Sequence, residues 1–449
     1  MKTLIFSILT GLSSLPGVSA APQLRAGIAR VDITPGGPIW LAGYASRTKP
    51  SEGVLQPLWA KALAIEDEKG ARVILVSTDL IGLPRTLTDW AGAEIMKRYG
   101  VERSNIVFNS SHTHTGPAIR ENLAPMYDLK GADAKAVDDY RTFLAQKLID
   151  LAGAALGDLQ PARIDFAQGQ ATFGMNRREL SPTGVKLGVN PAGAVDHSVP
   201  VLRVTAPNGK VRAILAGYAC HNTTLTGEFY QLSGDYAGFM QAEVERALPS
   251  VTAMFFQLCG GDQNPNPRSQ LELAQQHGKT IATEIVRVVQ GTMAPVSGRV
   301  KAVYQLVDLP LAPHTREQFE KEAADSNVFK ARRAKLMLQA YDERREPRKV
   351  ALPVQAIRFT RGFTLLALGG EVVVEYGLWA KKTWPQEPLM VAGYSNDVPC
   401  YIPNAHIIRE GGYEPVDSMI YYGQPGPFSE EMEERLKDGM SKVMERVKK

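Results

Sequence analysis

Strand-like and helix-like segments alternate along almost the whole chain, and this alternation limits the folds that it can adopt. Short continuous apolar runs are typical of strands buried on both faces. They occur in AGIARVDI, KALAIE, RVILVSTDL, NIVFNSS, VPVLRVT, VRAILAGYAC, VTAMFFQLC, FTLLALGG and LMVAGYSN. Amphipathic helical spacing is found between them, over Thr86–Tyr99, Ala134–Leu156, Tyr236–Leu248, Gln270–Gln290, Arg316–Tyr341 and Ser429–Val447. This order predicts an α/β fold in which mixed sheets are covered by helices.

The composition is that of a folded globular protein, with 44% apolar and 22% charged residues among 449. This length predicts one large domain or two. The net charge of +4 is small and no basic block stands out, which argues against a nucleic-acid partner.

The N-terminal segment MKTLIFSILTGLSSLPGVSA carries one lysine, an apolar stretch and a small-x-small ending at Val18-Ser19-Ala20. This pattern predicts a signal peptide at residues 1–20 and a secreted or periplasmic mature chain, residues 21–449. The alternative is a short membrane anchor. Gly11 and Pro16 interrupt the apolar run, which is too short to cross a hydrocarbon core of ~30 Å.

Three cysteines, Cys220, Cys259 and Cys400, cannot form a complete disulfide framework. We expect each to be a free, buried thiol. A thiolate metal ligand is the alternative for Cys220, which precedes His221. Neighbours in an extended strand point to opposite faces, so burial is favoured.

Polar side chains follow the predicted core strands at the point where each strand ends. In α/β sheets, that edge is where ligands bind. The residues concerned are Asp79, His112, His114, His221, Asn222, Asp262, Asn264, Glu371 and Tyr401. Two histidines and a glutamate are donors that suit zinc, and three protein ligands with an open position are typical of a catalytic site. The separations are long and no local metal motif supports the site, so a polar turn at HTHTGP stays an alternative.

Eight short motifs, in order, resemble those of the neutral (non-lysosomal) ceramidases, a family of secreted or membrane-facing zinc amidohydrolases. The resemblance covers about residues 24–425. The motifs are GIARVDITP with LAGYASR, NSSHTHTGP, GMNRR, YACHNTTL, SGDYAG, GGDQNPN, GGE and YSNDVPCYIPNAHIIREGGYE.

The resemblance implies a role for each matching residue. The implied zinc ligands are His112, His221, Glu371 and Tyr401. His114 matches a catalytic histidine or one that orients a ligand, and Arg177 matches an active-site arginine. Tyr413, twelve residues after Tyr401, matches a tyrosine that binds the polar head of the substrate.

The chain also departs from the family pattern. Asn264 stands where the family has its active-site serine. An amide side chain cannot act as an alkoxide nucleophile, but it can donate to a developing oxyanion. Glu371 follows two glycines in place of Pro-Ala, and the chain ends after one helix, where the family's full enzymes continue into a β-sandwich domain. These departures affect the expected substrate more than the metal.

We therefore expect a secreted zinc-dependent hydrolase that cleaves an N-acyl amide with zinc-held water. His114 would handle protons, Arg177 and Tyr413 would position the substrate, and Asn264 would support the oxyanion. The expected partner is a small or lipid-like acyl substrate, and the basic stretch 330–349 suggests a solvated helix face or transient contact with a membrane surface. The alternatives are a zinc hydrolase of an ester, lactone or acylated sugar, a metal phosphoesterase, and a binding protein without catalysis.

Overall fold

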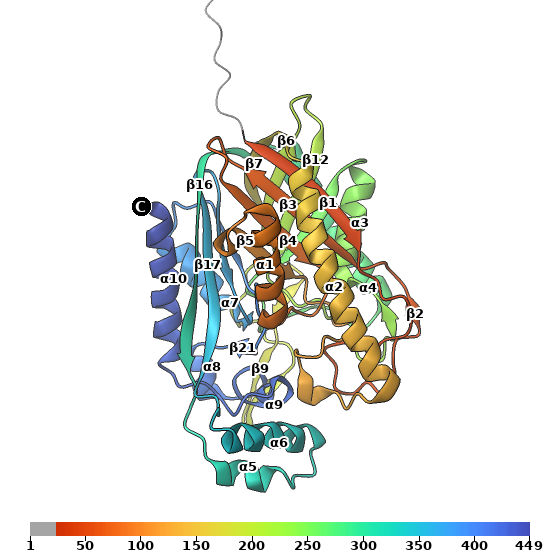
Figure 1. Ribbon diagram of the computed structural model, residues 1–449, viewed down its shortest axis with the longest axis vertical. Coiled ribbons are helices and arrows are strands. Elements are labelled where there is room, and N and C mark those ends of the chain that lie inside the picture. Colours follow the sequence, from red (N-terminus) through yellow and green to blue (C-terminus); the bar gives the residue numbers. More distant parts are fainter. Residues whose placement is uncertain (1–23) are drawn as a thin grey trace, which may run out of the picture.

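Two twisted sheets pack face to face, and helices cover both outer faces, in a computed structural model that describes residues 24–449 (Figure 1). The five-stranded sheet has the order β5 (Ile106–Ser110), β4 (Arg72–Thr78), β3 (Trp59–Glu66), β1 (Arg25–Asp32), β6 (Gln160–Pro161). The eight-stranded sheet has the order β14 (Thr252–Gln257), β12 (Val211–Tyr218), β11 (Ser198–Thr205), β7 (Arg163–Gln170), β16 (Ala294–Pro310), β17 (Lys349–Arg361), β18 (Thr364–Leu368), β20 (Leu389–Ala392). The predicted mixed α/β fold is confirmed, whereas the predicted signal peptide lies outside the described residues.

Four two-stranded pairs complete the strands among residues 24–449. They are β2 (Gly53–Val54) with β13 (Gln231–Leu232), β8 (Gly174–Asn176) with β15 (Gln263–Pro265), β9 (Arg178–Ser181) with β10 (Gly184–Leu187), and β19 (Glu371–Val372) with β21 (Tyr401–Ile402). The α-helices are α1 (Arg85–Tyr99), α2 (Gly131–Gly157), α3 (Asp235–Ala247), α4 (Leu271–Gln290), α5 (Arg316–Glu322), α6 (Val328–Asp342), α7 (Val374–Thr383), α8 (Ala405–Glu410), α9 (Met419–Tyr422) and α10 (Met432–Lys448). The shorter helical turns are η1 (Arg103–Asn105), η2 (Ala124–Met126) and η3 (Tyr413–Asp417).

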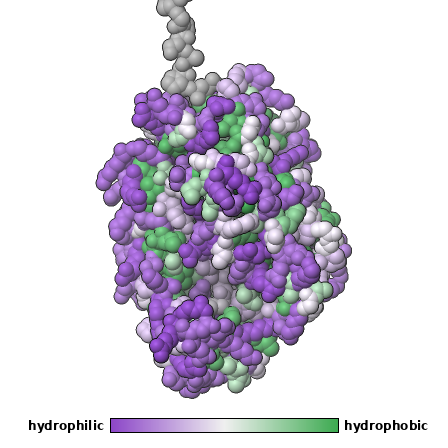
Figure 2. Space-filling model, viewed as in Figure 1, coloured by the Kyte–Doolittle hydropathy of each residue, from purple (hydrophilic) through white to green (hydrophobic). Residues whose placement is uncertain are grey.

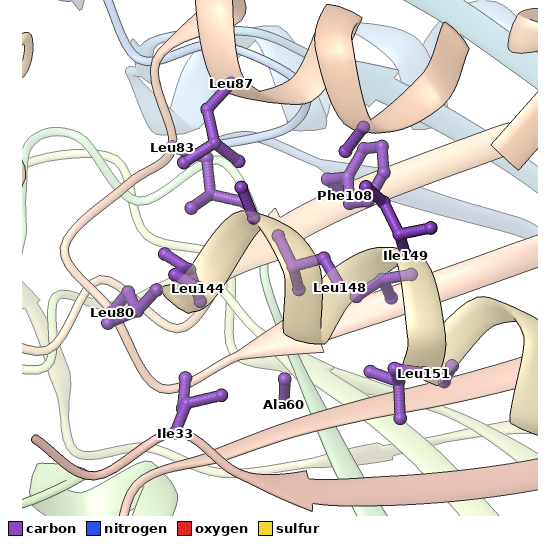
Figure 3. Packing of buried hydrophobic residues seen from close by; sticks show 14 of the residues in the cluster. Ile33, Ala60, Leu80, Leu83, Leu87, Phe108, Leu144, Leu148, Ile149 and Leu151 are labelled. Atoms are coloured by element: carbon purple, nitrogen blue, oxygen red, sulfur yellow. The ribbon is translucent and has the colours of Figure 1, made fainter. Parts of the chain in front are cut away.

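Successive residues of the central strands point to opposite faces of the sheet, and both faces are buried, which explains their continuous apolar pattern. In β3, Leu63 and Ile65 enter the core between the two sheets, whereas Ala62 and Ala64 face the helices outside. Small alanines on the outer face let α2 approach the sheet closely. Figure 3 shows this outer core, where Leu144, Leu148, Ile149 and Leu151 of α2 gather with side chains from the sheet and from α1. On the eight-stranded sheet, α3 and α4 cover one half, and α7 and α10 cover the other.

Most predicted segments are found in the structure, with one clear correction. Each of the nine strand-like runs contains a strand, but the predicted helix Arg316–Tyr341 is two helices, α5 and α6. The break occurs because the side chain of Asn327 accepts hydrogen bonds from the backbone N–H groups of Phe329 and Lys330 and so starts a new helix. The long strands β16 and β17 were not predicted. The polar, partly exposed residues of β16 interrupt its apolar pattern.

Three pairs of neighbouring strands in the two large sheets are parallel: β4 with β5, β12 with β14, and β18 with β20. Asn109 of β5 joins the ends of these pairs. Its Nδ2 donates to the carbonyl oxygens of Gln257 (3.2 Å) and Gly393 (2.8 Å), and its Oδ1 accepts from the Gln257 N–H (2.8 Å). The carboxyl ends of all three pairs therefore meet in one place. Among residues 24–449, no helix is both long and apolar enough to cross a bilayer.

Candidate metal centre

The structure brings three distant segments together at this meeting point. His112 follows β5, His221 follows β12, and Glu371 follows β18. Tyr401 is the register partner of Glu371 across the β19·β21 pair, so one short parallel ladder places both side chains. All four residues are buried, with exposed fractions of 2% or less.

Glu371 lies between the two histidines. Its Oε2 is 3.0 Å from His112 Nε2 and 3.0 Å from His221 Nε2. Its oxygens also accept hydrogen bonds from the hydroxyls of Tyr394 and Tyr422.

The outer ring nitrogens fix the tautomers of the two histidines. His112 Nδ1 is 2.6 Å from the Ile81 carbonyl oxygen, and His221 Nδ1 is 2.8 Å from the Gly260 carbonyl oxygen. A carbonyl only accepts, so each Nδ1 carries the proton and each Nε2 presents a lone pair to the cluster. Burial also lowers the pKa of His221 to about 3, which disfavours a second proton. Two lone pairs facing a carboxylate call for a cation between them.

His114 completes a group of three histidines whose ring nitrogens lie within 4.8 Å of one another. Its Nε2 is 3.1 Å from His112 Nε2, and burial holds its pKa well below the usual value. Its Nδ1 is buried without a hydrogen-bond partner among the described residues. A Cβ added at Gly43 would lie 2.3 Å from this nitrogen. The sequence predicted a catalytic or orienting role for His114, and the geometry also makes it a candidate ligand.

Tyr401 and Arg177 form the next layer of the site. The Tyr401 hydroxyl is 3.1 Å from His221 Nε2 and accepts a hydrogen bond of 2.9 Å from Arg177 Nη2. Burial raises the pKa of Tyr401, while the Arg177 guanidinium acts in the opposite direction. Arg177 is fixed in turn by Glu414, whose Oε1 accepts from Arg177 Nε at 2.9 Å. The carboxylate of Glu414 also accepts from Arg178 Nη1 (2.6 Å).

A cavity of about 180 Å³ opens above the cluster. Asn264 lies in the wall of this cavity. Its strand, β15, pairs with β8 in the register Asn264–Met175, and Arg177 follows directly after β8, so the two side chains lie close together. Asn264 Oδ1 accepts from Arg177 Nη1 (3.3 Å) and from Thr223 Oγ1 (3.1 Å). Tyr413 lies opposite, with its ring 5.5 Å from that of Tyr401 and under the Arg177 guanidinium.

All eight residues predicted for the site therefore lie in one cluster or in its cavity. Sequence reasoning missed Tyr394, Tyr422 and Glu414, which hold Glu371 and Arg177. Tyr394 could have been found as a polar residue at the end of the LMVAGYSN strand. Tyr422 comes from α9, and no local spacing links it to Glu371.

Other polar residues have structural roles. Asp79 accepts hydrogen bonds from Trp59 N and Gln241 Nε2, and Asp235 accepts from Leu225 N. Asp262 accepts from the N–H of Val374 at the start of α7, and burial raises its pKa to about 6. The three cysteines are free and buried, as expected, and burial raises the pKa of each thiol.

Comparison with known proteins gives a consistent match. The family model described as "Neutral/alkaline non-lysosomal ceramidase, N-terminal" matches residues 24–284. The neutral ceramidase of Pseudomonas aeruginosa is 25% identical over 273 residues, which are 59% of this chain and 40% of that protein. Neutral ceramidase A of Dictyostelium discoideum is 26% identical over 266 residues, or 55% of this chain and 36% of that protein. The matched part of the chain thus spans less than half of these relatives.

Solved structures show the same fold. A structure described as "Ceramidase complexed with C2" has a TM-score of 0.74 at 19% identity and covers 95% of this chain and 75% of that chain. The crystal structure of the neutral ceramidase from Pseudomonas aeruginosa has a TM-score of 0.73, with the same identity and coverage. The structural likeness extends over both sheets, beyond the segment that the family model matches.

Proposed function

The chain belongs to the neutral/alkaline non-lysosomal ceramidase family, and we propose that it is a zinc-dependent hydrolase of an N-acyl amide bond. We further propose that residues 21–449 form one catalytic domain and that the protein is exported after loss of residues 1–20. One observation carries the metal proposal. The Nε2 lone pairs of His112 and His221 both face a Glu371 oxygen at 3.0 Å, an arrangement that a cation stabilises.

The donor set fits zinc. Imidazole nitrogens and a carboxylate oxygen are its usual ligands, and the carbonyls behind His112 and His221 orient the rings as the outer partners of metal-bound histidines do. We assign the metal to His112, His221, Glu371 and Tyr401. A bound Zn²⁺ would supply Lewis acidity and would lower the pKa of a water molecule in its open position to about 7.

The surrounding side chains can perform the remaining steps. His114 is neutral because its pKa is lowered by burial, so its unprotonated ring nitrogen can accept the proton of the attacking water and pass it to the leaving amine. Arg177 is held by Glu414 and keeps the Tyr401 oxygen polarised. Tyr413 and Arg177 line the cavity and position the substrate. The products are a carboxylic acid and an amine.

Asn264 makes a covalent route through this position impossible, since its amide is no nucleophile. Its Oδ1 already accepts from Arg177 and Thr223, which leaves the Nδ2 donors to support an oxyanion. We propose single-step attack by water. Intact-mass spectra during turnover should contain only free enzyme, and a trapped acyl adduct on any side chain would contradict this route.

We propose that the substrate is smaller or more polar than long-chain ceramide. The cavity of about 180 Å³ is below the ~300–1,000 Å³ typical of sites for drug-sized ligands. The face of the molecule in Figure 2 is largely polar, with apolar residues in small scattered groups. A lipid-extracting enzyme usually presents an apolar patch. The test compares the kcat/KM for dispersed long-chain ceramide with the values for short N-acyl amines, lactones and acylated sugars. A tenfold preference for ceramide would overturn this proposal.

The metal assignment has a direct test. We expect about one zinc per chain in the purified protein and loss of most of it in His221→Ala, measured by elemental analysis. His406→Ala is the matched control, because this half-exposed histidine lies outside the cluster. Full zinc content in His221→Ala would refute the assignment.

A further inference from the structure

Arg268 is a cation in the wall of the active-site cavity that the proposed reaction does not use. It follows β15 on the loop after Asn264 and is half-buried. Its Nε donates to the Thr223 carbonyl oxygen (2.8 Å), and its Nη2 donates to the Tyr44 hydroxyl (2.9 Å). These two contacts hold the guanidinium between Thr223 and Tyr44, which both line the cavity. The Tyr44 ring in turn packs 4.8 Å from that of His114.

The charge of Arg268 is not paired. No carboxylate among residues 24–449 lies within 4.0 Å of it, and its Nη1 has no hydrogen-bond partner there and remains accessible. Arg177 differs, because Glu414 neutralises it. Asp235 acts on Arg268 only at longer range, with its own oxygens engaged by the N–H groups of Leu225 and Tyr236.

The rest of the cavity offers no compensating negative charge. Its lining contains no aspartate or glutamate. Behind it, Arg47 donates to the carbonyl oxygens of His114 (2.7 Å) and Ala42 (2.6 Å) and also lacks a carboxylate partner among the described residues. The Tyr44 ring packs on the Arg47 guanidinium at 5.0 Å, so it lies between two cations. A concave site with an unpaired cation in its wall and a second cation behind it concentrates anions.

We propose that Arg268 binds an anionic oxyacid group of the substrate, a carboxylate or a phosphate. This inference rests on the proposed hydrolysis of an N-acyl bond and names its substrate class: an N-acylated amine that carries a negative charge, as in an N-acyl amino acid. Arginine suits this role because its fork of N–H donors matches the oxygens of carboxylates and phosphates. Arg268 is then a specificity-determining residue.

The test uses pairs of substrates in which one member is anionic and the other is neutral. N-acetylglycine is compared with N-acetylglycinamide, and O-phospho-N-acetylethanolamine with N-acetylethanolamine, on the zinc-loaded protein. We expect at least a tenfold higher kcat/KM for the anion of one pair, and the better pair identifies carboxylate or phosphate. In Arg268→Gln the ratio should fall by about 10- to 100-fold, the range of a charge-assisted hydrogen bond. Arg361→Gln, an exposed control without an ion pair, should keep the wild-type ratio.

Two results would overturn the proposal. The first is equal kcat/KM within both pairs. The second is an equal loss on both members of a pair in Arg268→Gln, which would show that Arg268 only braces Tyr44. If no compound is hydrolysed, calorimetry with the same pairs decides. If the anion binds and its binding depends on Arg268, the anion site is supported although the proposed hydrolysis fails. If anion and neutral compound bind equally, the anion site is refuted.

Discussion

At the scale of single residues, Gly43 controls the place of His114. Its φ of +91° lies in the region that favours glycine, and an added Cβ would be 2.3 Å from His114 Nδ1. We predict that Gly43→Ala displaces His114 and lowers kcat/KM by about 100-fold, the cost of a misplaced catalytic group. Gly36→Ala is the control, because nothing lies within 4 Å of its added Cβ. A kcat/KM of Gly43→Ala within twofold of the wild-type value would show that catalysis does not require His114 in this position.

Asp235 makes a prediction about pH and stability. Burial raises its pKa to about 6 from 3.8. The folded protein then binds more protons than the unfolded chain between these values, so its free energy of unfolding falls as the pH rises through this window, by up to ~3 kcal/mol from this residue. We expect the free energy of unfolding of Asp235→Asn, measured by urea titration, to fall less steeply than that of the wild type from pH ~4 to ~7. The exposed Asp417→Asn serves as control, and a slope unchanged by Asp235→Asn would contradict the linkage.

At the scale of elements, the strands were predictable where both faces are buried. β3, β4 and β5 read as continuous apolar runs because one face meets α1 and α2 and the other meets the second sheet. β16 could not be recognised because only one of its faces is consistently apolar. The break between α5 and α6 depends on the cap at Asn327, whose signal is weaker than the apolar spacing on either side.

The positions of the histidines, Glu371 and Tyr401 were predictable from strand ends, but the roles of the phenols were not. Tyr401 reaches the cluster through the β19·β21 register and Tyr422 through the short α9. Both placements are set by tertiary packing. For Tyr401 and Tyr413 only the family resemblance identified a role, and for Arg268 nothing in the sequence did.

The helix α10 provides a prediction at this scale. Its apolar face, with Met440 fully buried, packs on β16 and β17 rather than facing solvent. We predict that Met440→Ala lowers the free energy of unfolding by ~2–5 kcal/mol, the usual cost of such a cavity. Chemical denaturation measures the change, with the exposed Glu434→Ala as control. A loss below ~0.5 kcal/mol, as for a surface substitution, would mean that α10 is not part of the core.

At the scale of the whole molecule, the candidate metal centre forms because two sheets present the ends of three parallel strand pairs to one another. Each pair contributes one residue of the cluster: His112 beyond β4·β5, His221 beyond β12·β14, and Glu371 beyond β18·β20. Asn109 is the only side chain that we find bonded to the backbone of both other pairs among the described residues. The geometry of the cluster should therefore depend on a residue that touches none of its ligands.

Asn109→Ala tests this dependence. It leaves the carbonyl oxygen and the N–H of Gln257 without a partner, and each buried unpaired group costs ~1–3 kcal/mol. The Gly393 carbonyl oxygen still accepts from Ser395 Oγ at 2.8 Å. We therefore predict a loss of at least ~2 kcal/mol in the free energy of unfolding, similar to Met440→Ala. The two variants should differ in zinc binding. Asn109→Ala releases the strand ends that hold the ligands, so competition with a chelator should show at least tenfold weaker zinc binding, whereas Met440→Ala should bind zinc as the wild type does. If both variants keep wild-type affinity, the cluster is held by its own short ladders and hydrogen bonds, and the junction at Asn109 contributes stability alone.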